Sequence, residues 1–117
     1  MNKADETRLR VIHALPCMAC VKEGISQPSR TESHHIVDKG YREHSGGHQA
    51  TLPLCGWHHR ADVLGCNALC NSPTISNALI VYGPSLGAHK KRFIERYGPE
   101  RELLAKVDQL IAGVEAA

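Results

Sequence analysis

Two short cysteine motifs carry the strongest chemical signal in the chain. Cys17 and Cys20 are separated by two residues, and Cys55 and His58 repeat that spacing later in the sequence. A gap of two residues lets both side chains of a tight turn reach one ion, and three cysteines with one histidine are a standard tetrahedral set for structural zinc. We therefore predict a structural Zn²⁺ ion bound by these four residues. The alternative is that the cysteines are small buried hydrophobic residues and the histidine lies at the surface.

Two further cysteines, Cys66 and Cys70, leave this assignment open. They could replace Cys55 and His58 as ligands, but three residues separate them and they lie in a segment without clear periodicity, so we favour buried thiols. The chain has 5 cysteines and 8 histidines. An odd count mixed with histidine argues against a disulfide framework and favours a reducing, cytoplasmic location.

The remaining histidines indicate a second ion. His59 directly follows His58, His34 and His35 form another adjacent pair, and His89 precedes a basic stretch. Neighbouring residues on a helix point roughly 100° apart, so His59 faces away from a zinc ion bound by His58. A lone histidine is more often an ordinary surface or core residue, but two adjacent pairs around a zinc motif are unlikely to arise by accident.

The elements that must hold these histidines are a hairpin and a helix. Apolar spacing and a following proline predict a helix over 5–15. Residues 31–37 are predicted to form a strand, 38–47 a glycine-rich loop, and T-L-P-L a returning strand with Pro53 at an edge or strand end. A helix is predicted to begin near the second histidine pair.

The second half of the chain is predicted to hold an excursion and two helices. Residues 61–85 are interpreted as an insertion with a short strand at 78–82. A helix follows Gly87 and ends at Gly98, and an amphipathic helix spans 99–115. Its apolar residues, which we assign to core packing, are Leu103, Leu104, Val107, Leu110, Ile111 and Val114.

Composition limits the remaining possibilities. With 117 residues the chain forms one small domain, 1–117, and its single Phe and single Trp give a thin core that a metal would reinforce. The net charge of +2 excludes little. Lys90, Lys91 and Arg92 form a local basic patch that can contact phosphates, although a solvated helix face explains it equally well. We see no signal peptide and no membrane span.

Three stretches together resemble the HNH endonucleases, most closely the phage recombination-enhancement (Ref) group of RecA-dependent nucleases. They are E-S-H-H-I-V, then L-P-L-C-G-W-H-H-R, and finally the approach to His89 with R-F-I-E-R-Y-G-P-E-R-E-L-L. The resemblance runs from Leu15 to Leu110, apart from 61–85. It implies an α+β fold, a treble-clef-like ββα-metal domain with a structural zinc ion and flanking helices.

The resemblance also implies roles for the histidines. His34 and His59 would bind a catalytic divalent ion, Mg²⁺, Mn²⁺ or Zn²⁺, and His35 would be the general base. The third ligand would be His89, with Asp62 and His48 as alternatives. The middle Asn of the HNH pattern is replaced in H-Q-A-T-L, where His48 or Gln49 would orient the base.

Two local expectations follow from these roles. Adjacent residues with different tasks cannot share one face of a regular strand, so we predict that the strand bends or ends at His34. Glu32 could anchor a histidine through its second ring nitrogen, although a surface carboxylate is the more common case.

The expected function is a metal-dependent endonuclease that cuts DNA with low sequence specificity, with phage recombination as the expected setting. Arg60, Lys90, Lys91 and Arg92 are the expected phosphate contacts. The expected partners are DNA and a RecA filament in a bacterial host, from a phage or prophage gene. Because the founding phage member carries a long basic arm and little precedes Cys17 here, a RecA-independent nickase is the other expectation. A non-catalytic zinc module that binds DNA or a recombination protein is the alternative class, and a purely structural treble clef is a weaker one.

Overall fold

A two-stranded antiparallel sheet forms the centre of the fold. The computed structural model describes residues 1–63 and 74–116. Within them, strand β1 (Thr31–His35) pairs with strand β2 (Thr51–Cys55). Pro53 lies in the middle of β2 opposite Ser33, which this hairpin tolerates because both of its strands are edge strands.

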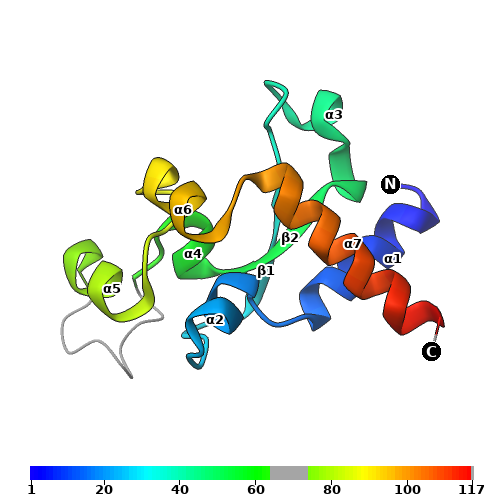
Figure 1. Ribbon diagram of the computed structural model, residues 1–117. Helices are drawn as coiled ribbons and strands as arrows, with labels where there is room; N and C mark the ends of the chain where they lie inside the picture. The colour runs from blue at the N-terminus through cyan, green and yellow to red at the C-terminus, as the bar shows by residue number, and fades with distance from the viewer. Residues whose placement is uncertain (64–73, 117) are drawn as a thin grey trace.

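Helices precede, interrupt and follow the hairpin (Figure 1). Before and within it are α1 (Lys3–Ala14), α2 (Met18–Glu23), α3 (Arg42–Ser45) and the 3-10 turn η1 (Gly47–Gln49). After it come α4 (Gly56–Arg60), α5 (Ile75–Tyr82), α6 (Lys90–Tyr97) and α7 (Glu100–Ala116). The predicted α+β class is confirmed, and the order β1, β2, α4 is that of a ββα unit.

Local sequence explains where several helices begin and end. The Asn2 side chain accepts a hydrogen bond from the Asp5 amide at 2.8 Å and caps α1. Thr74 caps α5 in the same way, at 3.2 Å from the amide of Asn77. Gly24 ends α2 with a φ of 69°, a left-handed conformation that glycine adopts without steric penalty.

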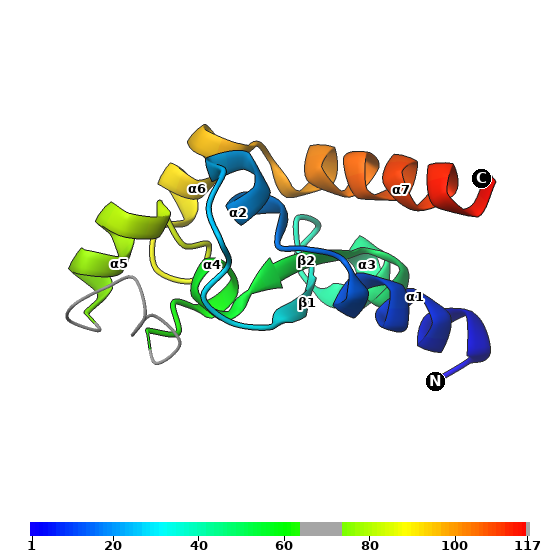
Figure 2. The same ribbon diagram turned by 90° about the horizontal axis from the view of Figure 1, so that it is seen from below.

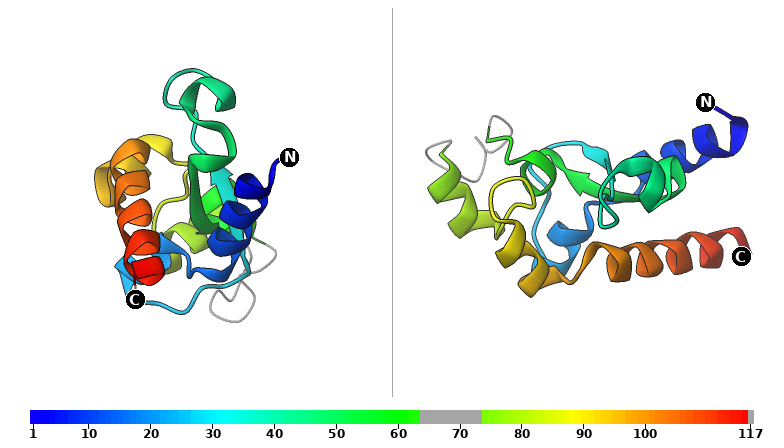
Figure 3. Two further views of the ribbon diagram at one scale, coloured as in Figure 1. Left: turned by 90° about the vertical axis from the view of Figure 1, so that its right-hand side faces the viewer. Right: turned by 90° about the horizontal axis from the view of Figure 1, so that it is seen from above.

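The long helices α1 and α7 lie on either side of the hairpin (Figures 2 and 3). Arg8 of α1 donates to the Thr51 carbonyl at 2.8 Å and pairs with Asp108 of α7 at 2.6 Å, so one side chain joins all three elements. In α7, Val107 is buried but Leu110 is 52% exposed. The predicted apolar stripe is therefore buried at Leu103, Leu104 and Val107, and Ile111 is partly buried against the core.

The core collects large side chains from both halves of the chain around the hairpin. Its largest fully buried members are Trp57, Tyr82, Phe93, Ile12, Ile36, Leu52 and Leu54. They come from α4, α5, α6, α1, β2 and the residue after β1. This core lies beside both histidine pairs and fixes the elements that carry them.

Three expectations about elements are corrected. Residues 78–82 are not a strand, because Ile75–Tyr82 forms helix α5, capped by Thr74. The loop 38–47 contains helix α3 and the start of η1. Strand β1 does not end at His34, because His35 still pairs with Thr51. Cys66 and Cys70 lie outside the described residues.

In the described part of the chain, no helix is both long and apolar enough to span a bilayer.

Candidate functional site

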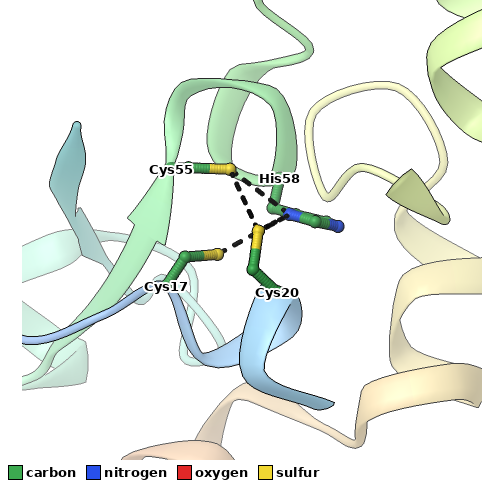
Figure 4. Close-up of side chains that lie close together, drawn as sticks. All are labelled: Cys17, Cys20, Cys55 and His58. Atoms are coloured by element: carbon green, nitrogen blue, oxygen red, sulfur yellow. Dashed lines mark hydrogen bonds between the residues drawn. The ribbon is translucent and has the colours of Figure 1, made fainter. Parts of the chain in front are cut away.

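The side chains of both cysteine motifs converge on one point in the core. Cys17 and Cys20 flank the start of α2, and Cys55 and His58 come from the end of β2 and from α4 (Figure 4). His58 Nδ1 lies 3.6, 3.5 and 3.3 Å from the sulfurs of Cys17, Cys20 and Cys55, and the last two sulfurs are 3.8 Å apart. All four side chains are at most 2% exposed.

These separations fit a tetrahedral zinc ion. Bonds of about 2.3 Å to sulfur and 2.0 Å to nitrogen put tetrahedral sulfurs about 3.8 Å apart and nitrogen about 3.5 Å from sulfur. His58 Nε2 donates to the buried Tyr82 carbonyl at 2.8 Å, which leaves the Nδ1 lone pair directed at the sulfurs. Among the described residues, no other group of three or more Cys, His, Asp or Glu brings its ligand atoms within 4.8 Å of one another.

The charge in this cluster also favours a cation. Burial lowers the pKa of His58, but the sulfurs of Cys17 and Cys55 outweigh it and raise that pKa to about 9. Hydrogen bonds from Cys20 and Cys55 lower the pKa of the Cys17 thiol. Hydrogen bonds with Cys17 and Cys55 raise the pKa of the Cys20 thiol, so negative charge is placed on Cys17, and the Cys3His set can hold a metal ion.

A second group of titratable side chains lines an open cavity beside α4. His34 and His59 meet there with ring centroids 5.1 Å apart. The cavity has a volume of about 400 Å³ and is lined by His34, Val37, His59, Arg60, Leu86, Gly87, Lys90 and Glu100. The predicted ligands on β1 and α4 are thus brought together, whereas the ring of His58 lies in the Cys3His cluster.

A carboxylate holds each of these two histidines. His59 Nδ1 lies 2.8 Å from Glu32 Oε1, and His34 Nε2 lies 2.9 Å from Glu100 Oε1. Burial lowers the pKa of His59 more than Glu32 raises it, so the ring is neutral, as a metal ligand requires. Burial raises the pKa of Glu100, but the hydrogen bond from His34 outweighs it and the carboxyl group stays ionised.

His35 makes a separate contact with His48 of η1. Its Nε2 is 2.8 Å from His48 Nδ1, so in the tautomer with a proton on Nε2 the Nδ1 of His35 keeps a free lone pair. Burial, followed by the charge of Arg42, lowers the pKa of His35 to about 4. His48 therefore lies where the sequence placed an orienting residue, whereas Gln49 donates to Asp5 at 2.9 Å.

The third predicted ligand, His89, makes other contacts. Its Nδ1 accepts from the Ser85 amide at 3.3 Å, its ring lies 6.1 Å from that of Trp57, and it does not line the cavity. Asp62 lies within 3.2 Å of the Arg60 guanidinium. Glu100 lines the cavity instead, a position that spacing could not reveal because 66 residues separate it from His34.

The four predicted phosphate contacts differ in their surroundings. Arg60 is paired with Glu32 at 2.9 Å, and this contact raises the pKa of the guanidinium. Lys90, Lys91 and Arg92 are exposed in the first turn of α6, and Lys90 also lines the cavity. Positive charge in a first turn is unfavourable next to the positive end of the helix dipole. A bound anion would therefore stabilise these three side chains electrostatically.

Gly87 fixes the loop behind His59, and its replacement provides a test of the site. A Cβ at this position would lie 2.8 Å from Arg60 Cα and 3.2 Å from the His59 carbonyl oxygen. We expect Gly87→Ala to cost about 1–3 kcal/mol in the free energy of unfolding, because backbone must move away. Chemical denaturation measures the loss. Gly113→Ala is the control, since a Cβ there meets no atom within 4 Å, and equal effects of both substitutions would contradict the close approach.

The comparison with known families covers almost the whole chain. A family described as recombination enhancement, RecA-dependent nuclease, matches residues 3–112. The match includes both cysteine motifs, both histidine pairs and Glu100. No solved structure matches the chain.

Proposed function

The chain belongs to the recombination-enhancement, RecA-dependent nuclease family, and from this we propose that it is a metal-dependent DNA endonuclease of the HNH type. One observation supports the proposal most. Adjacent histidines at the end of β1 have different partners, because His34 meets His59 and Glu100 whereas His35 meets His48. A purely structural module needs no such division between an ion-binding histidine and a histidine with a free lone pair.

The proposed site requires two metal ions with different tasks. Structural zinc in the Cys3His cluster joins α2 to β2 and α4. A catalytic divalent ion held by His34 and His59 would supply a Lewis acid for a phosphate oxygen and the leaving oxygen. The carboxylate of Glu32 orients His59 by holding its Nδ1, which leaves Nε2 for the cavity.

In the proposed reaction, His35 is the general base. Its neutral imidazole accepts a proton from water through Nδ1 while Nε2 donates to His48. The water oxygen bonds to phosphorus, the bond to the 3′ oxygen breaks, and that oxygen takes a proton from solvent. The products carry 5′-phosphate and 3′-hydroxyl ends.

The basic residues at the start of α6 are proposed to bind the phosphate backbone without reading sequence. Each phosphate contact contributes about −0.9 to the slope of log K against log salt for duplex DNA. We therefore expect Lys90→Ala/Lys91→Ala/Arg92→Ala to make this slope shallower by about 2–3, measured by fluorescence anisotropy on unrelated duplexes. A triple variant at Lys3, Arg10 and Lys22, exposed residues of α1 and α2, is the charge-matched control. Equal slopes in the two triple variants would contradict this assignment.

The partner is proposed to be DNA in a RecA filament, as the family description implies, in the cytoplasm of a bacterial host. Nicking of a plasmid with Mg²⁺ or Mn²⁺, with and without a RecA-coated homologous strand, tests both the proposed nuclease activity and its dependence on RecA. Cutting only in the presence of RecA supports it, and cutting in both reactions supports a RecA-independent nickase. DNA binding without cutting under any condition would favour a non-catalytic module and overturn the enzyme.

A further inference from the structure

We propose that Glu100, the first residue of α7, is the third protein ligand of the ion held by His34 and His59. This inference rests on the proposed function, because it concerns the same cavity. It replaces a set of three histidines with two histidines and one carboxylate. It also gives α7 a part in the active site.

Burial of the Glu100 side chain is the first observation that supports this role. The residue is 5% exposed, although it lies at the start of a helix where carboxylates are usually solvated. Its Oε1 accepts from His34 at 2.9 Å and its Oε2 from the Val37 amide at 3.4 Å. A buried carboxylate is costly unless positive charge compensates it. His34 and the exposed Lys90 both favour the ionised form of Glu100, whereas Arg60 is paired with Glu32. A divalent cation beside Glu100 would compensate the buried charge more directly than the distant ammonium of Lys90.

The separation of the donor atoms is the second observation. Two ligand atoms about 2.1 Å from one ion at right angles are about 3.0 Å apart. His34 Nε2 and Glu100 Oε1 are separated by 2.9 Å, and the ring of His59 lies at 5.1 Å from that of His34. One ion can therefore replace the shared proton between His34 and Glu100. His59 has to move closer to join it, because the ligand atoms of the three residues do not all lie within 4.8 Å of one another.

The chemistry of this donor set is suited to phosphate hydrolysis. Two histidines and one glutamate form a site with open positions for substrate oxygen. A carboxylate also favours Mn²⁺ or Mg²⁺ more than a third imidazole would. The cavity around the set is open and large enough, at about 400 Å³, to admit a phosphate group.

Binding of Mn²⁺ to the zinc-loaded protein, followed by electron paramagnetic resonance, tests the role of Glu100 without an activity assay. We expect Glu100→Gln to weaken Mn²⁺ binding by at least about tenfold. Glutamine keeps one oxygen that can accept from His34, and it loses the charge and the longer contact of 3.4 Å with the Val37 amide. A merely structural Glu100 would therefore leave the affinity nearly unchanged. Glu102→Gln, an exposed site on the same helix, is the matched control, and His89→Ala is expected to bind Mn²⁺ like the wild type.

The outcomes separate this inference from the function on which it rests. Loss of binding in His59→Ala together with wild-type affinity in Glu100→Gln would overturn the role of Glu100 alone. A wild-type protein that binds no Mn²⁺ beyond its zinc would overturn both proposals. If Glu100→Gln loses its zinc or does not fold, an anomalous map of wild-type crystals soaked in Mn²⁺ shows whether Glu100 is a ligand of the ion. An ion bonded to Glu100 supports the assignment, and an ion bonded only to other residues overturns it.

Discussion

Replacement of His35 with alanine is expected to lower the rate of metal-dependent DNA nicking by about 10²–10⁴-fold, the usual contribution of a general base. The imidazole of His35 is neutral at pH 7 because burial and Arg42 hold its pKa at about 4. It touches none of the four zinc ligands, and its ring contact is with His48 of η1. The substitution should therefore remove proton transfer without disturbing the fold.

Three measurements make this expectation specific. Duplex binding and zinc content of His35→Ala should match those of the wild type, while nicking of supercoiled plasmid falls. His44→Ala is the matched control, because this exposed histidine of α3 makes an edge-to-face contact with Tyr41 next to η1. His48→Ala should show a smaller loss than His35→Ala, since it removes only the partner that orients the base. Wild-type nicking by His35→Ala would refute general-base catalysis by this residue.

Features that depend on neighbours in sequence were predictable from the chain alone. The two-residue gaps in the cysteine motifs predicted four residues that the structure brings together within 4.8 Å. The hairpin and the helix after it followed from strand-forming residues and turn-forming glycines. The divergence of His58 and His59 followed from helix geometry, and the structure places one at the cysteines and the other beside His34.

Two local expectations were wrong for identifiable reasons. The apolar run at 78–82 was interpreted as a strand because it is short and β-branched, but Thr74 and Gly83 are the cap residues of a helix over Ile75–Tyr82. Strand β1 was expected to bend or end at His34 so that the adjacent histidines could differ in task. The strand does not end there, because His35 still pairs with Thr51, and the two histidines differ instead in their partners from other segments.

Contacts between distant segments were beyond the reach of the sequence. Glu100 meets His34 across 66 residues. Glu32 was a candidate anchor for a histidine, but the sequence did not show that the histidine would be His59, 27 residues away. The Tyr82 carbonyl that fixes the tautomer of His58 comes from a segment interpreted as an insertion. Such partners depend on how α5 and α7 pack on the core, which no spacing rule encodes.

Loss of the zinc site is expected to have the largest effect on stability. Structural zinc contributes about 10–16 kcal/mol of apparent binding free energy in small zinc domains, which is comparable to or larger than the 5–15 kcal/mol that typically stabilises a whole domain. Cys55 ends β2 and its sulfur contacts both Cys20 and His58, so Cys55→Ser removes a ligand where α2, the hairpin and α4 meet. We expect this variant to lose both its zinc and its cooperative thermal transition.

Metal analysis and circular dichroism would measure this loss, and a strong chelator should reproduce it in the wild type. Cys66→Ser and Cys70→Ser are the controls, because these cysteines form the alternative ligand pair. If they lose zinc while Cys55→Ser retains it, the ligand set is the alternative one. Loss of zinc in Cys55→Ser, together with full zinc content in Cys66→Ser and Cys70→Ser, is the expected result. It would show that zinc holds α4 against the hairpin. Because His59 follows His58 on that helix, nicking should then disappear together with the fold rather than before it.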